Sequence, residues 1–546
     1  MSPDPYDVVP TFWDRHREWI APVAAGPLTV FLLVAAFPPL HAPEAAYACL
    51  VPGIFWAYLR PRLRLYAWTM FAAQALAWTI NLGWLHPVTW VGLLILGPLV
   101  GAWTGSWYLA AWWAMPRMVG RPTPVRLVAM LGIAGAWVLV EWSRTWLFGG
   151  FPWMPLAATQ CDAKTRSMLQ VAAFTGAVGV SFVVVAANIG LAAFAHRLFR
   201  EGEVGLRRRS PEFLLALFLF LVCLSVHVQE SVNRPQYTVP FARVAFVQPD
   251  IPATVKWDPA KEPEIMRTLW SETLAAGQTH PDLILWPESA TPFPLNDDPS
   301  MRRFVEQLSA RTKAPMLIGA DAVERSGPGR VAAYNAAFVV DPKLGVQTAY
   351  YAKRRLVQFG EYIPLRPLFG WIGKFAPLGD DFCAGTDPSP LVVTMGRGSA
   401  AFGVLICYED VFPELARDEV RSGADALVVV TNDAWYGEGA AAYQHAAHSV
   451  LVAVETRRPV LRCGNAGWSG WIDEFGTVRR VLADEQGSVY FRGAAAADVT
   501  RDQRWVGRDS FYVEHGDWFV VVCACLSAVG AALLGAPFAP PAEAKE

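Results

Sequence analysis

The chain has 546 residues, of which 53% are hydrophobic and only 17% are charged, and its mean hydropathy is +0.27. A soluble protein of this length carries more charge, so this composition predicts several membrane-spanning segments. The net charge of -2 gives no support for nucleic-acid binding. The eight cysteines form no CxxC pair and no Cys/His cluster with zinc spacing, so neither a disulfide framework nor a metal site is expected.

Apolar runs recur through the first 230 residues. Several reach the roughly 20 residues that a helix needs to cross a bilayer. We predict seven spans in this region and one near the end of the chain, at 20–40, 44–59, 65–84, 88–115, 127–147, 168–195, 212–228 and 517–537. The run 44–59 is short and contains Pro52, so the sequence leaves open whether it is a full crossing.

The charges of the connecting loops predict an orientation. Arginines gather after the second, fourth and sixth spans, at Arg60, Arg62, Arg64, Arg117, Arg121, Arg126, Arg197, Arg200 and Arg207 to Arg209. The positive-inside rule places these loops in the cytoplasm, and seven spans starting inside then place the following region outside. We therefore expect a membrane domain at 1–232, an extracytoplasmic domain at 233–512, and a closing helix with a short cytoplasmic tail at 513–546.

Glu141 and Arg144 lie one turn apart inside an apolar run. Ionisable groups at such positions are usually paired or functional. A structural ion pair and a contact with substrate both remain open for these two residues.

Residues 235–510 follow a different pattern, in which short β-branched runs alternate with helical ones. Strands interleaved with helices are typical of an α/β domain whose sheets are covered. The predicted strands are 242–248, 283–286, 316–319, 333–340, 346–353, 402–407, 427–431 and 460–463. The predicted helices are 260–276, 299–312, 411–421 and 441–456.

Three turns in this region carry reactive side chains at or just after the ends of predicted strands: Glu288, Lys353 and Cys407. Each has an ordinary alternative, because Glu288 can be a solvated loop residue, Lys353 part of a solvated basic run, and Cys407 a small buried hydrophobe. Together they suit acyl transfer. The carboxylate would take the thiol proton, the ammonium would stabilise the thiolate and the oxyanion, and the thiolate would attack a carbonyl carbon. The turn after Phe359 could bring Glu361 back near the lysine.

These motifs resemble the nitrilase, or carbon–nitrogen hydrolase, superfamily. The resemblance rests on Trp286-Pro-Glu288, on Lys353 with Phe359-Gly-Glu361-Tyr, and on Cys407-Tyr-Glu409. Further motifs are similar to the apolipoprotein N-acyltransferase family, namely Val247-Gln-Pro-Asp-Ile-Pro252, Lys256-Trp257-Asp258, Thr431-Asn-Asp433-Ala-Trp435-Tyr-Gly437, Gln444-His445, Gly149-Gly-Phe-Pro-Trp153 and Gly179-Val-Ser-Phe182. The resemblance covers about 20–535.

The resemblance implies an αββα sandwich at 235–510 and a catalytic triad of Glu288, Lys353 and Cys407. It implies supporting or substrate-binding roles for Trp257, Glu361, Tyr408 and Glu409. The reaction would move an acyl chain from a membrane phospholipid, through a Cys thioester, to the N-terminal amine of a diacylglyceryl-cysteine on an apolipoprotein. The chain would be a multi-pass protein of the bacterial inner membrane, with its catalytic domain in the periplasm, acting as a monomer without a cofactor.

The sequence departs from that family's pattern at Arg355, where a histidine is usual, at Gln358, where a proline is usual, and at Val452, where an arginine is common. The segment from Cys463 through Trp468 to Ser469 also varies. These departures leave acyl-donor preference open and remove no member of the triad.

Several residues have expected roles around the three turns. The segment Phe369–Leu378 and the turn at Trp435 and Tyr436 are candidates for an apolar roof that keeps water from the thioester, although core packing is as reasonable for the first. Asn432 is expected to shape the turn beside the nucleophile. His445 and His448 lie three apart on a helix, which favours packing or capping over metal binding.

Two other functions remain open. A membrane-tethered amidase or nitrilase would hydrolyse a small amide with the same three groups. A catalytically silent protein that binds lipids or lipoproteins would need none of them.

Overall fold

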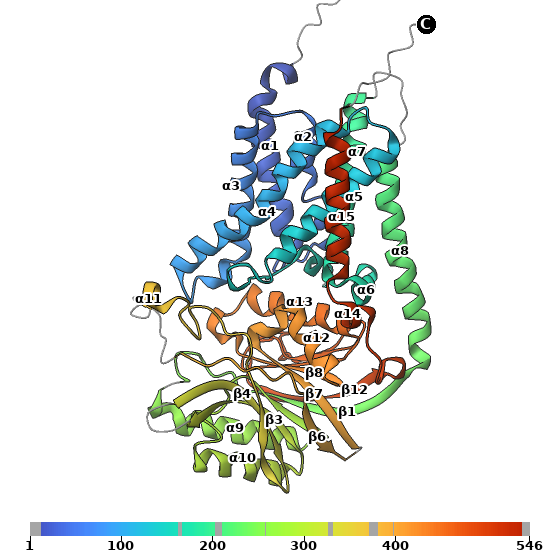
Figure 1. The fold of residues 1–546 in the computed structure, drawn as a ribbon. Helices are drawn as coiled ribbons and strands as arrows, with labels where there is room; N and C mark the ends of the chain where they lie inside the picture. The colour runs from blue at the N-terminus through green and yellow to red at the C-terminus, as the bar shows by residue number, and fades with distance from the viewer. Residues whose placement is uncertain are drawn as a thin grey trace, which may run out of the picture.

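The computed structural model describes residues 12–161, 166–201, 210–256, 258–325, 331–370, 381–396 and 398–537. The chain forms a bundle of long helices standing on two packed β-sheets (Figure 1). The bundle contains α1 (Phe12–Ala36), α2 (Val51–Tyr58), α3 (Leu63–Asn81), α4 (Trp90–Met118), α5 (Thr123–Ser143), α6 (Ala172–Thr175), α7 (Ala177–His196), α8 (Pro211–Asn233) and α15 (Trp518–Gly535).

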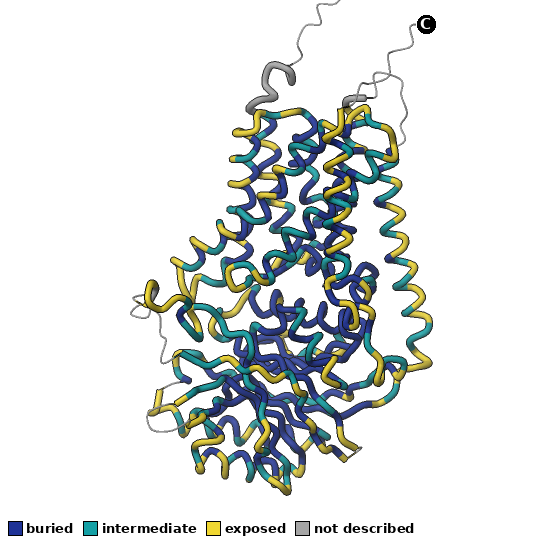
Figure 2. Tube along the Cα trace, in the orientation of Figure 1, coloured by how far each residue is buried: buried dark blue, intermediate teal, exposed yellow. Residues whose placement is uncertain are grey.

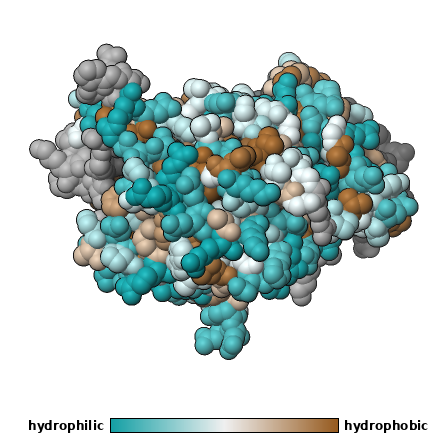
Figure 3. All heavy atoms as spheres, turned by 90° about the horizontal axis from the view of Figure 1, so that it is seen from below, coloured by the Kyte–Doolittle hydropathy of each residue, from teal (hydrophilic) through white to brown (hydrophobic). Residues whose placement is uncertain are grey.

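Five described helices are long and apolar enough to cross a membrane: α4, α5, α7, α8 and α15. Four of them carry many exposed residues, most clearly α8 and α15, whereas α7 is mostly buried inside the bundle (Figure 2). Water does not favour such long apolar faces, so a bilayer around the bundle accounts for them. The opposite end of the molecule, seen from below the sheets, is largely hydrophilic (Figure 3).

Several predicted spans differ from the structure. The spans predicted at 20–40 and 65–84 correspond to α1 and α3, which are not among these five helices. The span predicted at 168–195 is wrong at its start, because Gly176 has φ +72 and separates α6 from α7. The run 44–59 is not a continuous membrane helix: it consists of a 3-10 turn, η1 (Pro43–Tyr47), and the 8-residue α2, which rises only about 12 Å.

The interrupted run nevertheless connects the two ends of the bundle. At one end, the carbonyl of Pro38 accepts a hydrogen bond of 3.0 Å from Gln444 Nε2, next to the sheets. At the other end, the carbonyl of Pro61 accepts one of 2.8 Å from Trp112 Nε1, late in α4. The connections after α2 and α4 therefore lie at the end of the bundle farthest from the sheets, where Arg121 donates a hydrogen bond of 3.2 Å to Leu534 O in the last turn of α15.

Asn188 of α7 supports the break between η1 and α2. Its Oδ1 accepts a hydrogen bond of 2.8 Å from Leu50 N, and its Nδ2 donates one of 2.8 Å to Ala46 O. Non-helical backbone at membrane depth is tolerated only where protein satisfies its polar groups. Asn188 supplies both a donor and an acceptor for this purpose.

The sheet region consists of two six-stranded sheets. The first has the order β12-β1-β2-β3-β4-β5, with bounds Gly493–Asp502, Thr238–Gln248, Leu283–Trp286, Met316–Arg325, Val331–Asp341 and Gly345–Ala352. The second has the order β11-β10-β9-β8-β7-β6, with bounds Val478–Val481, Gly470–Ile472, Val460–Gly464, Ala426–Thr431, Gly398–Ile406 and Leu391–Met395. All eight predicted strands are present, whereas β6, β10, β11 and β12 were not predicted.

The layers follow the order helix, sheet, sheet, helix. Apolar side chains such as Phe246, Leu285 and Val404 fill the space between the sheets. The outer face of the first sheet is covered by α9 (Glu262–Gly277) and α10 (Pro299–Thr312). The outer face of the second is covered by α12 (Pro413–Arg421) and α13 (Ala440–Thr456). The predicted αββα sandwich is confirmed.

Helix α13 lies between the second sheet and the membrane helices, and nearly all of its residues are buried. The apolar core of the bundle continues through Val450 and Val454 of this helix to Val429 of β8. The sheets and the bundle therefore share one core and hold each other in a fixed arrangement.

Candidate active site

The three reactive side chains follow three different strands. β2 ends at Trp286, β5 at Ala352 and β7 at Ile406, so Glu288, Lys353 and Cys407 each begin or follow a strand-end turn. β2 runs parallel to β3. β4 is antiparallel to β3, and β5 is antiparallel to β4, so β5 has the direction of β3. β2 and β5 therefore point the same way and deliver Glu288 and Lys353 to one edge of the first sheet.

Close backbone packing fixes the position of Glu288. A Cβ built on Gly319 would come within 2.4 Å of Pro287 O and 2.7 Å of Glu288 Cα. Only glycine allows β3 to lie so close to the turn that carries the carboxylate.

Lys353 is a buried cation between two carboxylates. Its Nζ lies 2.8 Å from Glu361 Oε1 and 3.4 Å from Glu288 Oε1. Asn335 joins the same carboxylates, because its Nδ2 donates hydrogen bonds of 2.7 Å to Glu288 Oε1 and 3.0 Å to Glu361 Oε1. Burial alone would lower the pKa of Lys353, but Glu361 and Glu288 outweigh it and raise that pKa well above its ordinary value.

Cys407 has left-handed backbone geometry, with φ 53, and starts the 3-10 turn η11 (Cys407–Val411). A non-glycine residue held in this region usually has a structural or functional cause. Burial raises the pKa of its thiol strongly, the Glu288 carboxylate raises it further, and Lys353 opposes both. The thiol therefore stays protonated at rest and needs a base before it can act as a nucleophile.

Glu409 connects two segments of the site. One is the loop after β5 that begins with Lys353, called the lysine loop, and the other is η11, called the cysteine turn. Its Oε1 accepts hydrogen bonds from the backbone N of Arg354 at 2.6 Å and of Arg355 at 2.9 Å. Its Oε2 accepts from Ile406 N at 2.8 Å and from the Tyr351 hydroxyl at 2.9 Å. With all four bonds directed at backbone and tyrosine, this buried carboxylate fixes the spacing between Lys353 and Cys407.

Tyr408 connects the cysteine turn to the helical bundle. Its ring stacks on Phe151 and Trp153, at centroid distances of 6.2 and 6.5 Å, and packs edge-on against Phe412 at 5.1 Å. Both stacking partners belong to the loop after α5, so the bundle contributes directly to the surroundings of Cys407.

Glu141 and Arg144 shape that loop. Arg144 donates hydrogen bonds to the carbonyls of Phe151 and Trp153, and Glu141 Oε1 accepts one of 2.7 Å from Leu156 N. The structure thus gives both buried residues a structural role.

The other predicted site residues are distributed as follows. Asn432 shapes its turn, because its Oδ1 accepts from Ala434 N at 3.3 Å and from Asn465 Nδ2 at 3.0 Å. Trp435 is 40% exposed at the surface of the same turn. Trp257 and residues 371–378 of the predicted roof lie outside the described residues.

Two buried polar residues of the site were not predicted. Asn335 is one, and Lys256 is the other: its Nζ donates a hydrogen bond of 3.2 Å to the Glu288 carbonyl and interacts electrostatically with Asp321 and Glu288. Asn335 lies in an otherwise apolar strand prediction, 333–340, which was the only local signal for it. No group of three or more His, Cys, Asp or Glu among the described residues is arranged to hold a metal ion.

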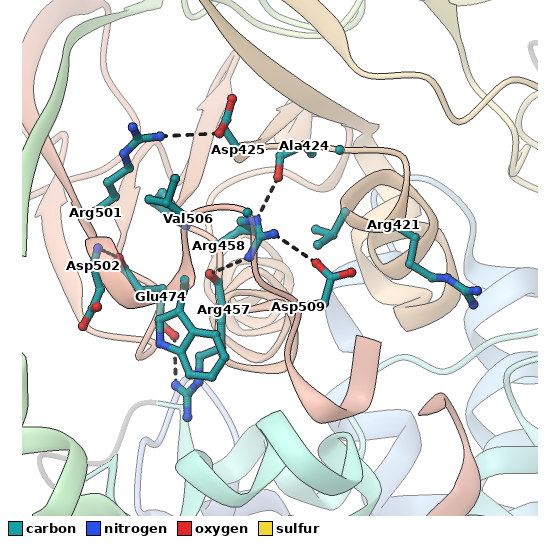
Figure 4. A pocket seen from close by; sticks show the side chains of 15 residues that line it. Arg421, Ala424, Asp425, Arg457, Arg458, Glu474, Arg501, Asp502, Val506 and Asp509 are labelled. Carbon is teal, nitrogen blue, oxygen red and sulfur yellow. Dashed lines mark hydrogen bonds and ion pairs between the residues drawn. The ribbon is translucent and has the colours of Figure 1, made fainter. Parts of the chain in front are cut away.

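A separate pocket of about 220 Å³ lies elsewhere, around Arg457, Arg458, Asp502 and Asp509 (Figure 4). Its charged groups pair with one another: Arg458 binds Asp509 at 3.1 Å and Arg501 binds Asp425 at 3.4 Å. None of the predicted site residues lines it.

Comparison with known proteins agrees with this architecture. Residues 243–500 match the family model of carbon-nitrogen hydrolases, and residues 30–190 match that of the apolipoprotein N-acyltransferase N-terminal domain. An apolipoprotein N-acyltransferase from Geobacter metallireducens is 34% identical over 433 residues, covering 78% of each chain. The chain belongs to the apolipoprotein N-acyltransferase family.

Other members of the apolipoprotein N-acyltransferase family match along almost the whole chain. The protein of that name from Chlorobaculum tepidum is 28% identical over 540 residues, covering 94% of this chain and 96% of its own. Among solved structures, an amidase from Nesterenkonia sp. is 19% identical and covers 48% of this chain and 92% of its own, with a TM-score of 0.36.

Proposed function

We propose that the protein transfers an acyl chain from a membrane phospholipid to the N-terminal amine of a diacylglyceryl-cysteine on apolipoproteins, through a thioester on Cys407. The observation that carries this proposal is that the Cys407 thiol interacts with the Glu288 carboxylate and the buried Lys353 ammonium in a turn that packs against the helical bundle. Family membership supports the substrate class, because the curated relatives are named apolipoprotein N-acyltransferases.

In the first half-reaction, Glu288 takes the proton of the Cys407 thiol, and the sulfur attacks the ester carbonyl of the phospholipid. Lys353, together with the backbone N–H of Tyr408 at the start of η11, would stabilise the oxyanion. The tetrahedral intermediate then collapses and the C–O bond breaks. Glu288 returns its proton to the leaving glycerol oxygen, so a lysophospholipid departs and a thioester remains.

In the second half-reaction, the neutral amine of the apolipoprotein attacks the thioester carbonyl. Glu288 accepts a proton from the nitrogen, and the C–S bond breaks as the amide forms. The thiolate regains a proton from Glu288, which restores the resting site. Glu361 and Asn335 would keep Lys353 and Glu288 in register through both steps, by the contacts of 2.8 and 2.7 Å given above.

The position of the site supports access from a bilayer. Leu365, which precedes the short helix α11 (Arg366–Phe369), and Leu368 within it are 67% and 68% exposed. α11 lies at the level where the bundle meets the sheets (Figure 1). Exposed apolar side chains at this level favour contact with lipid, and with Trp435 they would form part of a roof that excludes water from the thioester.

We further propose that the sheets face the periplasm of the bacterial inner membrane. The connections after α2 and α4, which carry Arg60 and Arg121, lie at the opposite end of the bundle, and Arg117 is in the last turn of α4. Such arginines mark the cytoplasmic side.

Two of the departures from the family pattern act between the sheets and the bundle. Arg355 donates a hydrogen bond of 3.1 Å to Thr145 O and lies over the Phe412 ring at 4.5 Å. Gln358 Nε2 donates one of 2.9 Å to Phe148 O. These contacts hold the lysine loop against the loop after α5. Arg355 and Gln358 therefore bridge the sheets and the bundle and leave Lys353 in place.

A transfer assay tests the proposed function. Purified protein is incubated with a phospholipid carrying a labelled acyl chain and with a synthetic diacylglyceryl-cysteine peptide. We expect label on the peptide amine with wild-type protein, none with Cys407→Ser, and wild-type yield with Cys383→Ser as the matched control. Release of free fatty acid with no labelled peptide would contradict transfer and favour a hydrolase.

A further inference from the structure

Four buried charges lie directly behind Cys407. They are Asp410 of η11, Asp433 of the turn η12 (Asp433–Tyr436), His445 of α13 and Arg462 of β9, and all are at most 2% exposed. Arg462 pairs with both acids, at 2.8 Å to Asp410 Oδ2 and 3.2 Å to Asp433 Oδ2. The proposed acyl-transfer mechanism uses none of these groups.

The ring of His445 faces acceptors on both sides. Its Nδ1 lies 2.8 Å from Asp433 Oδ1, and its Nε2 lies 2.9 Å from Asp410 Oδ1 and 3.2 Å from the Cys407 carbonyl oxygen. Since all three oxygens can only accept, each ring nitrogen must carry a hydrogen and the ring is an imidazolium. Burial and Arg462 lower its pKa, but Asp410 and Asp433 outweigh them and raise it to about 9.

The group is therefore electrically balanced, with two carboxylates against an imidazolium and a guanidinium. Three further described neighbours are uncharged. Ser449 donates to Asp410 Oδ2 at 2.6 Å, Thr431 donates to Asp433 Oδ1 at 3.3 Å, and the Trp153 ring lies 5.4 Å from that of His445. Burial lowers the pKa of His448, on the same helix, to about 3, so that ring is neutral.

The balance matters for the nucleophile because Asp433 acts on it. The Asp433 carboxylate raises the pKa of the Cys407 thiol, in the same direction as Glu288. Without the imidazolium, one negative charge beside the sulfur would be uncompensated and would disfavour the thiolate in a medium of low polarity. His445 also holds the carbonyl of Cys407, whose backbone is in the left-handed region with φ 53.

We propose that His445 is a positioning residue for the acylation of Cys407. Its charge, together with that of Arg462, balances the two aspartates behind the sulfur, and its N–H holds the cysteine carbonyl so that the thiol faces Glu288 and Lys353. This inference rests on the proposed role of Cys407 as the nucleophile.

The test measures the rate at which iodoacetamide alkylates Cys407 in the intact protein between pH 7.0 and 8.5. Mass spectrometry of the Cys407 peptide gives the extent of alkylation at each time. Glutamine can still donate to the carbonyl but carries no charge. We therefore expect His445→Gln to slow alkylation of Cys407 about tenfold, equivalent to a rise of one unit in the thiol pKa. The matched control is His448→Gln, three residues along the same helix. Cys407 in this variant should be alkylated at the wild-type rate.

A second substitution separates charge from folding. Adding Asp433→Asn to His445→Gln restores the charge balance, so we expect alkylation to return to within about threefold of wild type. A purely structural role would make the double variant slower still. His445→Leu with Asp433→Asn also removes the donor to the carbonyl, and should remain about tenfold slow.

The inference is overturned if His445→Gln alkylates at the wild-type rate, or if the double variant with asparagine stays slow while its thermal unfolding is normal. If His445→Gln alone does not fold, the double variant decides, because the account requires it to fold and to react within threefold of wild type. The proposed function fails separately, when wild-type protein with an alkylatable Cys407 transfers no acyl chain.

Discussion

Lys353 is the residue on which the electrostatics of the candidate site depend. It is 1% exposed and lies between Glu288 and Glu361, which are themselves mostly buried. Removing one partner from such a group costs far more than an exposed pair is worth, because the remaining charges have no water around them. The same ammonium interacts electrostatically with Cys407 and could stabilise an oxyanion formed there.

Lys353→Met is therefore expected to lose activity and some stability together. Acyl transfer to the diacylglyceryl peptide should fall by at least about 10²–10³, the usual cost of losing one oxyanion donor. The midpoint of thermal unfolding in detergent should also fall, since two buried carboxylates lose their cation.

A second variant separates these two effects. Lys353→Met with Glu361→Gln removes one of the unpaired carboxylates, so stability should recover while transfer stays lost. Lys343→Met, an exposed lysine on the β4–β5 turn, is the matched control and should change neither quantity. Full activity in Lys353→Met would remove the lysine from the mechanism.

At the scale of elements, the interrupted crossing at 43–58 depends on one side chain of a neighbouring helix. Asn188 is fully buried and binds both the Leu50 N–H and the Ala46 carbonyl. The same side chain also donates to Val184 O of its own helix at 2.9 Å.

We predict that Asn188→Leu destabilises the bundle by about 1–3 kcal/mol for each backbone group left without a partner. The measurement is the free energy of unfolding in mixed detergent micelles. Ser225→Ala on α8 is the control, because Ser225 bonds only within its own helix, to Val222 O at 2.7 Å. Equal stability of the two variants would show that Asn188 does not support the break.

The sequence predicted the elements whose signal is local. The apolar runs before Glu288, Lys353 and Cys407 are strands, and each ends where the reactive residue needs it to end. β12 was not predicted because Gly493-Ala-Ala-Ala-Ala-Asp498 has little strand propensity, and its pairing with β1 decides its structure. Whether 44–59 is a full crossing stayed open, because composition alone does not reveal a break that a distant asparagine satisfies.

Much of the candidate site could also be anticipated, for the same reason. Strand ends, a proline before Glu288 and the turn at Glu361 are visible in the sequence. The roles of Asn335, Asp433 and His445 are not, because their partners lie 12 to 47 residues away and only the fold brings them together. Without coordinates, His445 was expected to be a packing or capping residue.

At the scale of the whole molecule, α13 joins the catalytic sheets to the membrane helices. The amide of Gln444 makes four hydrogen bonds to the bundle, two accepted from Trp84 and Trp153 at 2.9 Å and two donated to Pro38 O and Asn81 O at 3.0 Å. Farther along α13, Glu455 Oε1 accepts one of 2.6 Å from Ala177 N, at the start of α7. His445, between these anchors, faces Cys407.

This arrangement explains how a fold shared with carbon–nitrogen hydrolases can act on lipids. The stack of Phe151, Trp153 and Tyr408 places membrane-domain aromatics against the cysteine turn, so the surroundings of the thiol belong to both parts of the chain.

The most direct test of the account is mass spectrometry of the Cys407 peptide after the purified protein is incubated with phospholipid alone. We predict that this peptide gains the mass of one acyl chain, that hydroxylamine removes it as expected of a thioester, and that a diacylglyceryl-cysteine peptide takes it up. An unmodified Cys407, or an acyl chain on another residue while transfer proceeds, would contradict the account.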